Sequence, residues 1–235
     1  MRPPIKAYFR PFYFTTRKFR SGQLSVPELA YFKTLYFSQF GEDLFLDNFF
    51  RDQKLGFYVD VGAFHPYNGS NTCVFYKKGW RGINVEPNPI SFQAFPKHRP
   101  RDINLNIAVS NQEGEVSFNC LEELSGIDDG TYLFKNRAKA RHQCRVPVKP
   151  LHKILQTFVP PDTAIDFMSV DCEGHDEQVL LSNDWSKFRP HIILVEDHER
   201  HPGAIDKLLE SVDYTFERTL GLTKIFVNHA VPLVR

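Results

Sequence analysis

The chain has 235 residues, a formal net charge of +1 at pH 7, and ordinary shares of hydrophobic (42%) and charged (24%) residues, which predicts one globular domain with a short extension. The near-neutral charge argues against a general nucleic-acid-binding protein, and neither a long apolar run nor a signal-peptide core is found, so we expect a cytoplasmic protein without a membrane span. The four cysteines form no Cys-x-x-Cys pair, which argues against a zinc ribbon and favours buried thiols in a reducing cytosol.

The first predicted unit is an N-terminal extension over residues 1–37. Residues 1–27 carry interleaved basic and aromatic side chains and no acidic one. Such an arm is suited to peripheral contact with an anionic membrane, or to binding a phosphorylated substrate. We favour the alternative of an extension that packs on the domain or on a second copy in an oligomer, because its prolines interrupt a long amphipathic helix.

A strand, a glycine turn and a helix form the central predicted unit of the domain, which covers residues 38–235. The apolar strand Phe57–Val61 contains Asp60, Gly62 and Ala63 follow it at once, and Ser70 is a good N-cap for the next helix. This order is typical of nucleotide-binding units in open α/β sheets. Small residues let the backbone approach a ligand, and the N–H groups at the helix start attract an anionic end.

The next strand strengthens this interpretation, because Gly82–Glu86 ends on an acid. A carboxylate at the end of the second strand can accept protons from both ribose hydroxyls. The spacing from Asp60 to Glu86 suits one helix between two parallel strands. The alternative is that both acids are solvated strand ends; their order along the chain favours a ligand that carries ribose.

An irregular stretch over residues 121–143 interrupts the middle of the chain, between two strand-like segments. A loop of this length in a compact domain is typical of a lid or a substrate-binding insertion. We therefore expect it to cover the acceptor side of the cleft. Its basic side chains would contact an anionic acceptor or form a solvated basic face: Lys135, Arg137, Lys139 and Arg141.

The remaining chain alternates between strands and helices. Helices are predicted over residues 44–50, 72–78, 89–97, 151–158, 176–181 and 202–209, and strands over 57–61, 82–86, 103–107, 115–118, 144–148, 164–170, 190–195, 214–219 and 223–228. This pattern predicts an α/β, doubly wound, mostly parallel sheet closed by an antiparallel C-terminal hairpin. Ligands of such sheets bind at the carboxyl ends of the strands. The sequence places seven candidate side chains there: Asp60, Glu86, Asp171, Glu173, Glu196, Asp197 and His198.

These motifs, in this order, resemble the FkbM-type S-adenosylmethionine-dependent methyltransferases. The resemblance runs from about Ser38 to the C-terminus. It rests on Ser38-Gln-Phe-Gly-Glu-Asp43, Val59-Asp-Val-Gly-Ala63, Ser70-Asn-Thr72, Gly79-Trp-Arg-Gly-Ile-Asn-Val-Glu-Pro87, Ala108-Val-Ser110 with Gly114, and Asp166-Phe-Met-Ser-Val-Asp-Cys-Glu-Gly174. Pro66 departs from the pattern, since many members have glycine there. The resemblance implies a class I methyltransferase (Rossmann-like) fold and O-methylation of sugars or related small molecules.

The methyltransferase interpretation assigns roles along the cofactor, S-adenosylmethionine. Gly62 and Ala63 approach its methionine half, and Glu86 binds the ribose diol. Asn88 and Ala108 border the adenine. The full set of expected cofactor-binding residues is Asp60, Gly62, Ala63, Ser70, Asn71, Glu86, Asn88, Ala108 and Asp171. Asp171 faces either the methionine amino group or the acceptor.

The candidate general bases are four side chains that follow the later strands: Glu173, His175, Glu196 and His198. A base helps because a hydroxyl acceptor must lose its proton. Histidine titrates near neutrality, which favours His175 and His198, whereas its motif favours Glu173. The alternative for His175 is a helix-start residue that points to solvent. His65, in the cofactor turn, is either functional or a turn residue that bonds the backbone.

Three alternatives stay open. Asp171, Glu196, Asp197 and His198 offer oxygen and nitrogen ligands for a divalent metal, although we favour a site without one. A nicotinamide-dependent oxidoreductase would share the ribose acid, but the turn lacks Gly-x-Gly-x-x-Gly. A non-catalytic cofactor-binding module would have lost turnover, and the retained acids argue mildly against it.

Overall fold

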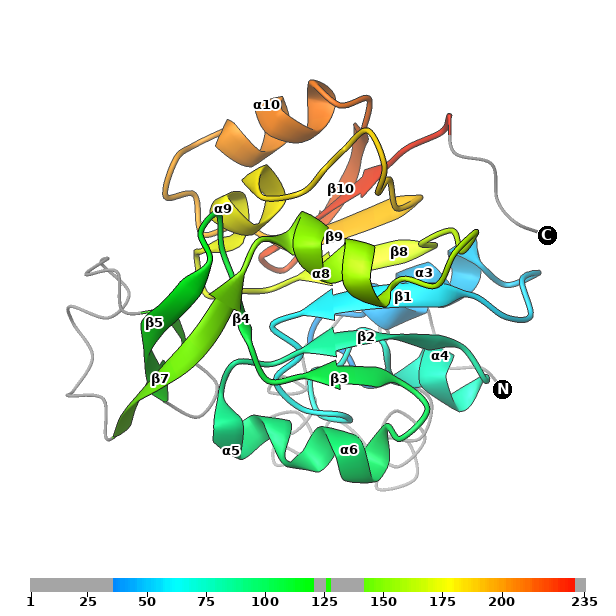
Figure 1. Ribbon diagram of the computed structural model, residues 1–235. Helices are drawn as coiled ribbons and strands as arrows, with labels where there is room; N and C mark the ends of the chain where they lie inside the picture. The colour runs from blue at the N-terminus through cyan, green and yellow to red at the C-terminus, as the bar shows by residue number, and fades with distance from the viewer. Residues whose placement is uncertain (1–35, 121–125, 128–141, 231–235) are drawn as a thin grey trace, which may run out of the picture.

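The computed structural model describes residues 36–120, 126–127 and 142–230 (Figure 1). Within these residues the main sheet has seven strands in the order β10-β11-β9-β8-β1-β2-β3. They are β1 (Phe57–Val61), β2 (Arg81–Val85), β3 (Ile103–Leu105), β8 (Phe167–Val170), β9 (Ile192–Glu196), β10 (Thr215–Leu220) and β11 (Thr223–Val227). The first five pair in parallel, and β11 is antiparallel to both β9 and β10. The predicted fold class is therefore confirmed.

Helices cover both faces of the main sheet. They are α3 (Glu42–Phe49), α4 (Cys73–Lys77), α5 (Pro89–Phe92), α6 (Ala94–His98), α8 (Leu151–Phe158), α9 (Asp176–Leu181) and α10 (Ala204–Glu210). The apolar faces of α8, α9 and α10 bury Val59 and Val61 on one side of the sheet. On the other side α3 and α4 pack against Tyr58, the next side chain along β1. Because successive side chains of a strand point to opposite faces, β1, which is buried along its whole length, requires both layers.

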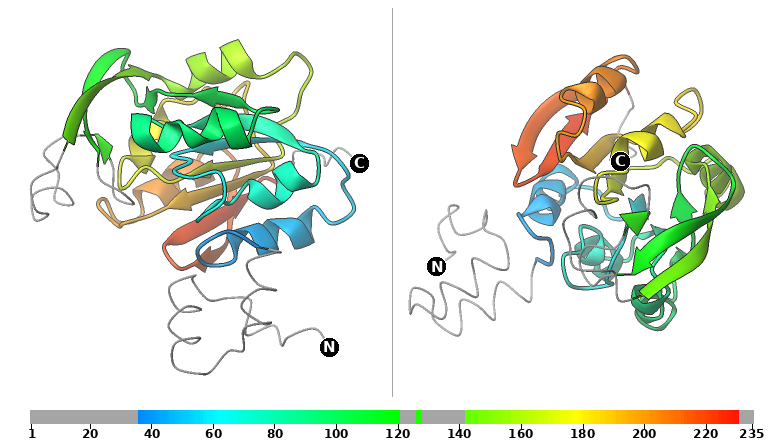
Figure 2. Two further views of the ribbon diagram at one scale, coloured as in Figure 1. Left: turned by 90° about the horizontal axis from the view of Figure 1, so that it is seen from below. Right: turned by 90° about the vertical axis from the view of Figure 1, so that its left-hand side faces the viewer.

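A second, smaller sheet stands beside the carboxyl end of β3 and contains four strands within the described residues, in the order β4-β7-β5-β6 (green in Figures 1 and 2). They are β4 (Ala108–Val109), β5 (Gly114–Cys120), β6 (Gly126–Ile127) and β7 (His142–Lys149). The sequence predicted only a hairpin-like excursion here. Buried side chains from β4, β5 and β7 give this sheet a core of its own, which short local patterns did not reveal.

Two other local predictions are corrected. The helix expected over residues 89–97 divides into α5 and α6 at Gln93. Within the stretch expected to be irregular, Gly126 and Ile127 form β6, and β7 begins two residues earlier than the predicted strand. The rest of that stretch, including Lys135, Arg137, Lys139 and Arg141, lies outside the described residues, as does the arm over residues 1–27. Among the described helices, none has the length and apolar character that crossing a membrane demands.

The motif Ser38-Gln-Phe-Gly-Glu-Asp43 has a structural role at the start of α3. Asp43 accepts the N–H of Phe37 (2.6 Å) and the hydroxyl of Ser38 (2.5 Å). Glu42 accepts the hydroxyl of Thr223 in β11 (3.0 Å). Both acids are buried, and burial raises the pKa of Asp43 to about 6. The motif therefore tethers α3 to the C-terminal hairpin as well as placing acids at a helix start.

Candidate active site

The carboxyl ends of β1, β2 and β8 meet at one edge of the main sheet, and backbone hydrogen bonds hold them together. The N–H groups of Gly62 and Ala63 both donate to the carbonyl of Val85, at 2.9 and 3.1 Å. The N–H of Asp171 donates to the carbonyl of Val61 at 2.9 Å. This fixed edge is where ligands of parallel sheets bind.

Gly62 is required at this edge for two independent reasons. Its φ of +80° lies in the left-handed region, which side-chain-bearing residues rarely adopt. A Cβ atom placed on Gly62 would also lie 1.7 Å from the backbone carbonyl oxygen of Asp171. Only a glycine at position 62 therefore lets the end of β1 approach the end of β8 this closely.

Glu86 is buried at the end of β2, and its carboxylate closes the turn after β1. One oxygen accepts the N–H of Phe64 and the other accepts the N–H of Asn88, each at 2.7 Å. Burial raises the pKa of Glu86 to about 7, against the lowering effect of these two bonds. Each carboxylate oxygen has a second acceptor position, so Glu86 can still accept from two further hydroxyls.

Arg99, a fully buried residue that follows α6, anchors the turn after β1. Its guanidinium donates to the carbonyl of Pro66 through two nitrogens, at 3.1 and 2.6 Å, and to the hydroxyl of Ser70 at 3.1 Å. Asp102 supplies the compensating charge at 3.6 Å. Sequence reasoning missed Arg99, because an arginine after a short helix looks like a surface residue.

Other residues that were predicted to bind the cofactor make hydrogen bonds that stabilise the turn after β1. The buried carboxylate of Asp60 accepts the hydroxyl of Thr72 at 2.8 Å, and burial raises its pKa to about 6. Ser70 is not the predicted N-cap, because α4 begins at Cys73 and its N-cap is Thr72, but the Ser70 hydroxyl accepts the N–H of Cys73 at 3.1 Å. Asn71 donates to the hydroxyl of Ser169 in β8 at 3.0 Å. Their cofactor contacts stay predictions.

Asn88 and Ala108, which were expected to border the adenine, lie in different settings. Asn88 caps α5, with its side-chain oxygen accepting the N–H of Ile90 at 3.0 Å. Ala108 is 1% exposed and belongs to the core of the second sheet. His65 accepts the N–H groups of Tyr67 and Asn68, both at 3.0 Å, which confirms the interpretation of a backbone-bonding turn residue.

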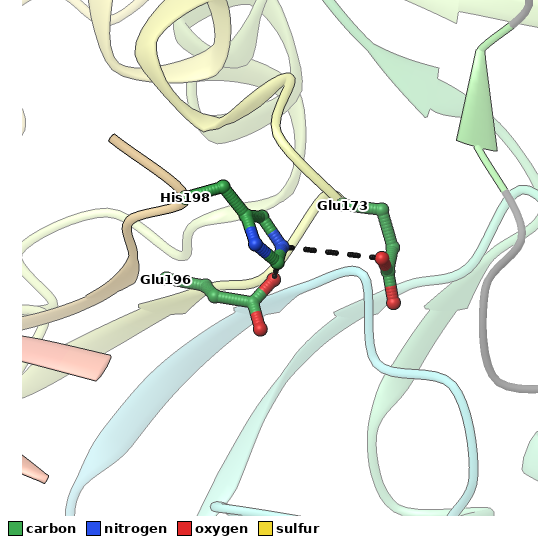
Figure 3. Close-up of side chains that lie close together, drawn as sticks. All are labelled: Glu173, Glu196 and His198. Carbon is green, nitrogen blue, oxygen red and sulfur yellow. Dashed lines mark ion pairs between the residues drawn. The ribbon is translucent and has the colours of Figure 1, made fainter. Parts of the chain in front are cut away.

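Three of the four candidate bases gather where β8 and β9 end (Figure 3). The imidazole Nε2 of His198 lies 2.8 Å from a carboxylate oxygen of Glu196 and 4.0 Å from one of Glu173. The contact with Glu196 is the main reason that the pKa of His198 is raised above its usual value. These residues form a charged group in which His198 lies between two acids.

Asp171 interacts with Glu196 and therefore belongs to the same group. Burial, followed by the charge of Glu196, raises the pKa of Asp171 well above its usual value. Burial alone would raise the pKa of Glu196 too, but the hydrogen bonds from His198 and Asp171 lower it. Burial and the neighbouring charge thus shift the pKa values of this pair in opposite directions, which favours the protonated form of Asp171 beside the Glu196 carboxylate.

His175 and Asp197 are separated from this group. The Nε2 atom of His175 lies 3.0 Å from the hydroxyl of Ser110 in the loop after β4, so His175 is not the helix-start residue in open solvent that the alternative described. Asp197 forms an ion pair with Lys224 at 2.8 Å. Among the described residues, the four-residue metal set that the sequence left open as an alternative is therefore not assembled.

A different set could hold a cation. Ligand atoms of Glu173, Glu196 and His198 all lie within 4.8 Å of one another. Oxygen and imidazole ligands suit several divalent metals. An imidazole must be neutral to ligate a metal, however, and the raised pKa of His198 favours its protonated form. The arrangement fits an ion pair better than a metal centre.

Backbone strain concentrates at the same edge. Phe64, Glu173 and Glu199 have φ values of 51°, 53° and 52°, and each lies three residues past the end of its strand, β1, β8 or β9. Left-handed conformations cost non-glycine residues free energy and are enriched at functional sites. At Glu173 the backbone is held in place, since the carbonyl of Glu173 accepts from Arg200 at 2.9 Å.

Comparisons with known proteins identify the family of the chain. The sequence profile of the methyltransferase FkbM domain matches residues 60–216, which include the turn after β1, Glu86 and the Glu173–His198 group. Among solved structures, a TehB-like SAM-dependent methyltransferase from Corynebacterium glutamicum is similar with a TM-score of 0.44 and 11% sequence identity, over 92% of this chain and 96% of that one. No curated protein sequence matches the chain.

Proposed function

The chain belongs to the FkbM methyltransferase family and is a methyltransferase that uses S-adenosylmethionine, and from this premise we propose that it methylates a hydroxyl group of a sugar or related small molecule, on a cytoplasmic glycan precursor. Family membership decides against the nicotinamide oxidoreductase. The observation that carries the proposal is the pairing, on one sheet edge, of a buried strand-end acid, Glu86, with the charged group of Glu173, Glu196 and His198.

The residues present fit the cofactor. When bound, S-adenosylmethionine supplies an electrophilic methyl group for in-line displacement, which needs positioning more than covalent help. Glu86 has acceptor positions left for the ribose diol. Gly62 lets the backbone of the turn pack closely against the end of β8. Arg99 holds the turn after β1 through its hydrogen bond to Pro66, so the residues expected to bind the cofactor are positioned without it.

The acceptor hydroxyl must also lose its proton, and the group formed by Glu173, Glu196 and His198 can remove it. Neutral His198, with its Nε2–H directed at Glu196, can accept that proton at Nδ1, and Glu196 then stabilises the imidazolium that forms. Glu173, across from Glu196, orients the hydroxyl or accepts the proton in its place. Because burial and Glu196 raise the pKa of Asp171, a protonated Asp171 would lessen the repulsion that three ionised carboxylates exert on an electron-rich acceptor oxygen.

An exposed aromatic side chain favours a sugar as the acceptor. Tyr67 is 38% exposed in the turn after β1, and its hydroxyl lies 3.2 Å from the imidazole Nδ1 of His98. Sugars bind through aromatic faces combined with hydroxyl hydrogen bonds. The aromatic ring of Phe75, in α4, is buried in the core and takes no part in binding the acceptor.

The direct test is turnover of isotopically labelled S-adenosylmethionine against a library of glycans and nucleotide sugars, with the product analysed by NMR. An O-methylated sugar is the expected product. Methylation on nitrogen or carbon would contradict the proposal. Cofactor binding without transfer to any acceptor would instead support the non-catalytic binding module.

Glu86→Gln is expected to weaken S-adenosylmethionine binding by about 10²-fold, since hydrogen bonds to an ionised carboxylate contribute roughly 1.5–3 kcal/mol each. Because the pKa of Glu86 is raised to about 7, the affinity of the unsubstituted protein should fall as the pH is lowered through that value. The variant should lose this dependence. Calorimetry between pH 6 and 8 measures both effects.

The matched control is Glu113→Gln, which changes an exposed acid paired with Lys153. It should leave the affinity and its pH dependence unaltered. Thermal unfolding of both variants separates loss of ribose binding from loss of the turn. Equal affinity in Glu86→Gln and the unsubstituted protein would rule out the ribose assignment.

Turnover is expected to survive removal of divalent metal ions. The Nε2 atom of His198 lies 2.8 Å from Glu196, and this contact raises the pKa of His198, so we expect the imidazole to pair with that carboxylate in preference to a metal ion. The measurement is methyl transfer after dialysis against EDTA, compared with the same sample after Mg²⁺ or Mn²⁺ is added back. Activity that disappears with EDTA and returns with either ion would show that the Glu173–Glu196–His198 set binds metal.

A further inference from the structure

Two thiols face each other in the second sheet, away from the charged group. The Sγ atoms of Cys120 in β5 and Cys144 in β7 lie 2.8 Å apart. The register pairs Cys120 with His142 and Phe118 with Cys144, so the two cysteines are diagonal neighbours across the ladder. Both thiols also point toward the carbonyl of Phe118, at 4.0 and 3.8 Å. Their side chains thus lie on the same face of the sheet and converge.

The two thiols differ in access. Cys120 is 8% exposed, whereas Cys144 is half-buried. Burial and the contact with Cys144 raise the pKa of the Cys120 thiol to about 12, so it resists attack on its own. When one thiol is more accessible than its neighbour, an oxidant can react at the accessible thiol and the neighbour can then resolve the mixed disulfide.

The other two cysteines lack this arrangement. All four cysteines of the chain lie within the described residues, and the remaining two are Cys73, a buried residue at the start of α4, and Cys172, whose thiol points to the carbonyl of Val61 at 3.9 Å. The expectation of four buried thiols holds for Cys73 and Cys120 and is wrong for Cys144 and Cys172, which are half-buried.

We propose that Cys120 and Cys144 are a modification site, at which a disulfide of the glutathione class oxidises the pair to a reversible intramolecular disulfide. Cys144 loses its proton to solvent and attacks one sulfur of the oxidant, forming a mixed disulfide and releasing one thiolate. Cys120 then loses its proton and attacks the Cys144 sulfur, which releases the second thiolate. Two protein thiols are oxidised by two electrons, and one glutathione disulfide is reduced to two glutathione molecules.

Bond formation requires only a small movement. A disulfide bond is about 2.05 Å long, and the two sulfur atoms already approach closely across adjacent strands. The bond would join the end of β5 to β7 and close the chain between them into a covalent loop. Because such a loop reduces the freedom of the unfolded chain, the oxidised protein should unfold at a temperature about 4–10 °C higher.

The experiment equilibrates the full chain in oxidised or reduced glutathione, blocks free thiols by alkylation and maps linked peptides by non-reducing mass spectrometry. We expect a Cys120–Cys144 linked peptide in the oxidised sample, its loss with dithiothreitol, and the higher unfolding temperature only in the oxidised protein. Cys120→Ser and Cys144→Ser should each abolish both signals, while the matched control Cys172→Ser keeps them.

Three results would overturn the inference. One is that both thiols stay fully alkylated in oxidised glutathione. Another is that glutathione accumulates on Cys144 without any linked peptide, since Cys120 would then fail to resolve it. The third is an equal oxidation-dependent temperature shift in Cys144→Ser, because the stabilisation would then come from elsewhere.

Discussion

Gly62→Ala is expected to destabilise the protein by about 2–5 kcal/mol and to remove measurable S-adenosylmethionine binding. The left-handed backbone costs an alanine roughly 1–2 kcal/mol, and overpacking against a fixed neighbour costs about 1–3 kcal/mol more. The neighbour is fixed because the clashing atom is the backbone carbonyl oxygen of Asp171, 1.7 Å from the new Cβ. Relief would require the ends of β1 and β8 to separate, which breaks the bond from Asp171 to Val61.

Gly203→Ala is the matched control for this effect. Gly203 has a similar left-handed φ of +72°, but a Cβ atom placed on it meets nothing within 4 Å. It should therefore show the backbone cost alone, with cofactor affinity unchanged. Urea unfolding and calorimetry on both variants measure the difference. If Gly62→Ala proves no less stable than Gly203→Ala, the two strand ends do not approach as closely as described.

His198→Ala and Glu173→Gln are expected to change the chemical step, with the rate of methyl transfer falling by about 10²–10⁴-fold in the variant that removes the base. Cofactor affinity should stay within about twofold, since neither side chain contacts Glu86 or the turn after β1 in the proposed arrangement. Single-turnover transfer of labelled methyl groups, combined with calorimetry, separates the two quantities.

The pH profile distinguishes a base from a merely structural residue. Because Glu196 raises the pKa of His198, the neutral base is scarce at low pH. The transfer rate should therefore rise with pH through a value above the ordinary 6.5 of histidine, and His198→Ala should lose that rise. Full activity in both His198→Ala and Glu173→Gln would defeat the assignment.

His201→Ala is the matched control for the catalytic variants. His201 follows the same strand as His198, but its side chain is 69% exposed and paired with Glu177 instead of the charged group. Its removal should alter neither the transfer rate nor the pH profile. A comparable loss in His201→Ala would indicate that the loop after β9, not a particular imidazole, controls the rate.

The sequence by itself predicted the architecture and the edge that carries the site. Apolar runs such as Phe57–Val61 indicate strands buried on both faces, and their alternation with helices implies a parallel sheet. Parallel strands end at one edge, so residues that follow them, such as Glu86 and Glu173, could be expected to gather without knowledge of any contact. The described structure and the family match bear out the fold and the family.

Contacts that depend on how distant strands pair were decided by the tertiary structure alone. Sequence reasoning offers both His175 and His198 as candidate bases, yet His175 contacts Ser110 in the loop after β4 and His198 contacts Glu196. The anchoring of the turn by Arg99 and the approach of Cys120 to Cys144 likewise join segments with no shared local pattern. Periodicity specifies which face of an element is buried, whereas which side chains meet there depends on strand order and register, and these are set by packing over the whole chain.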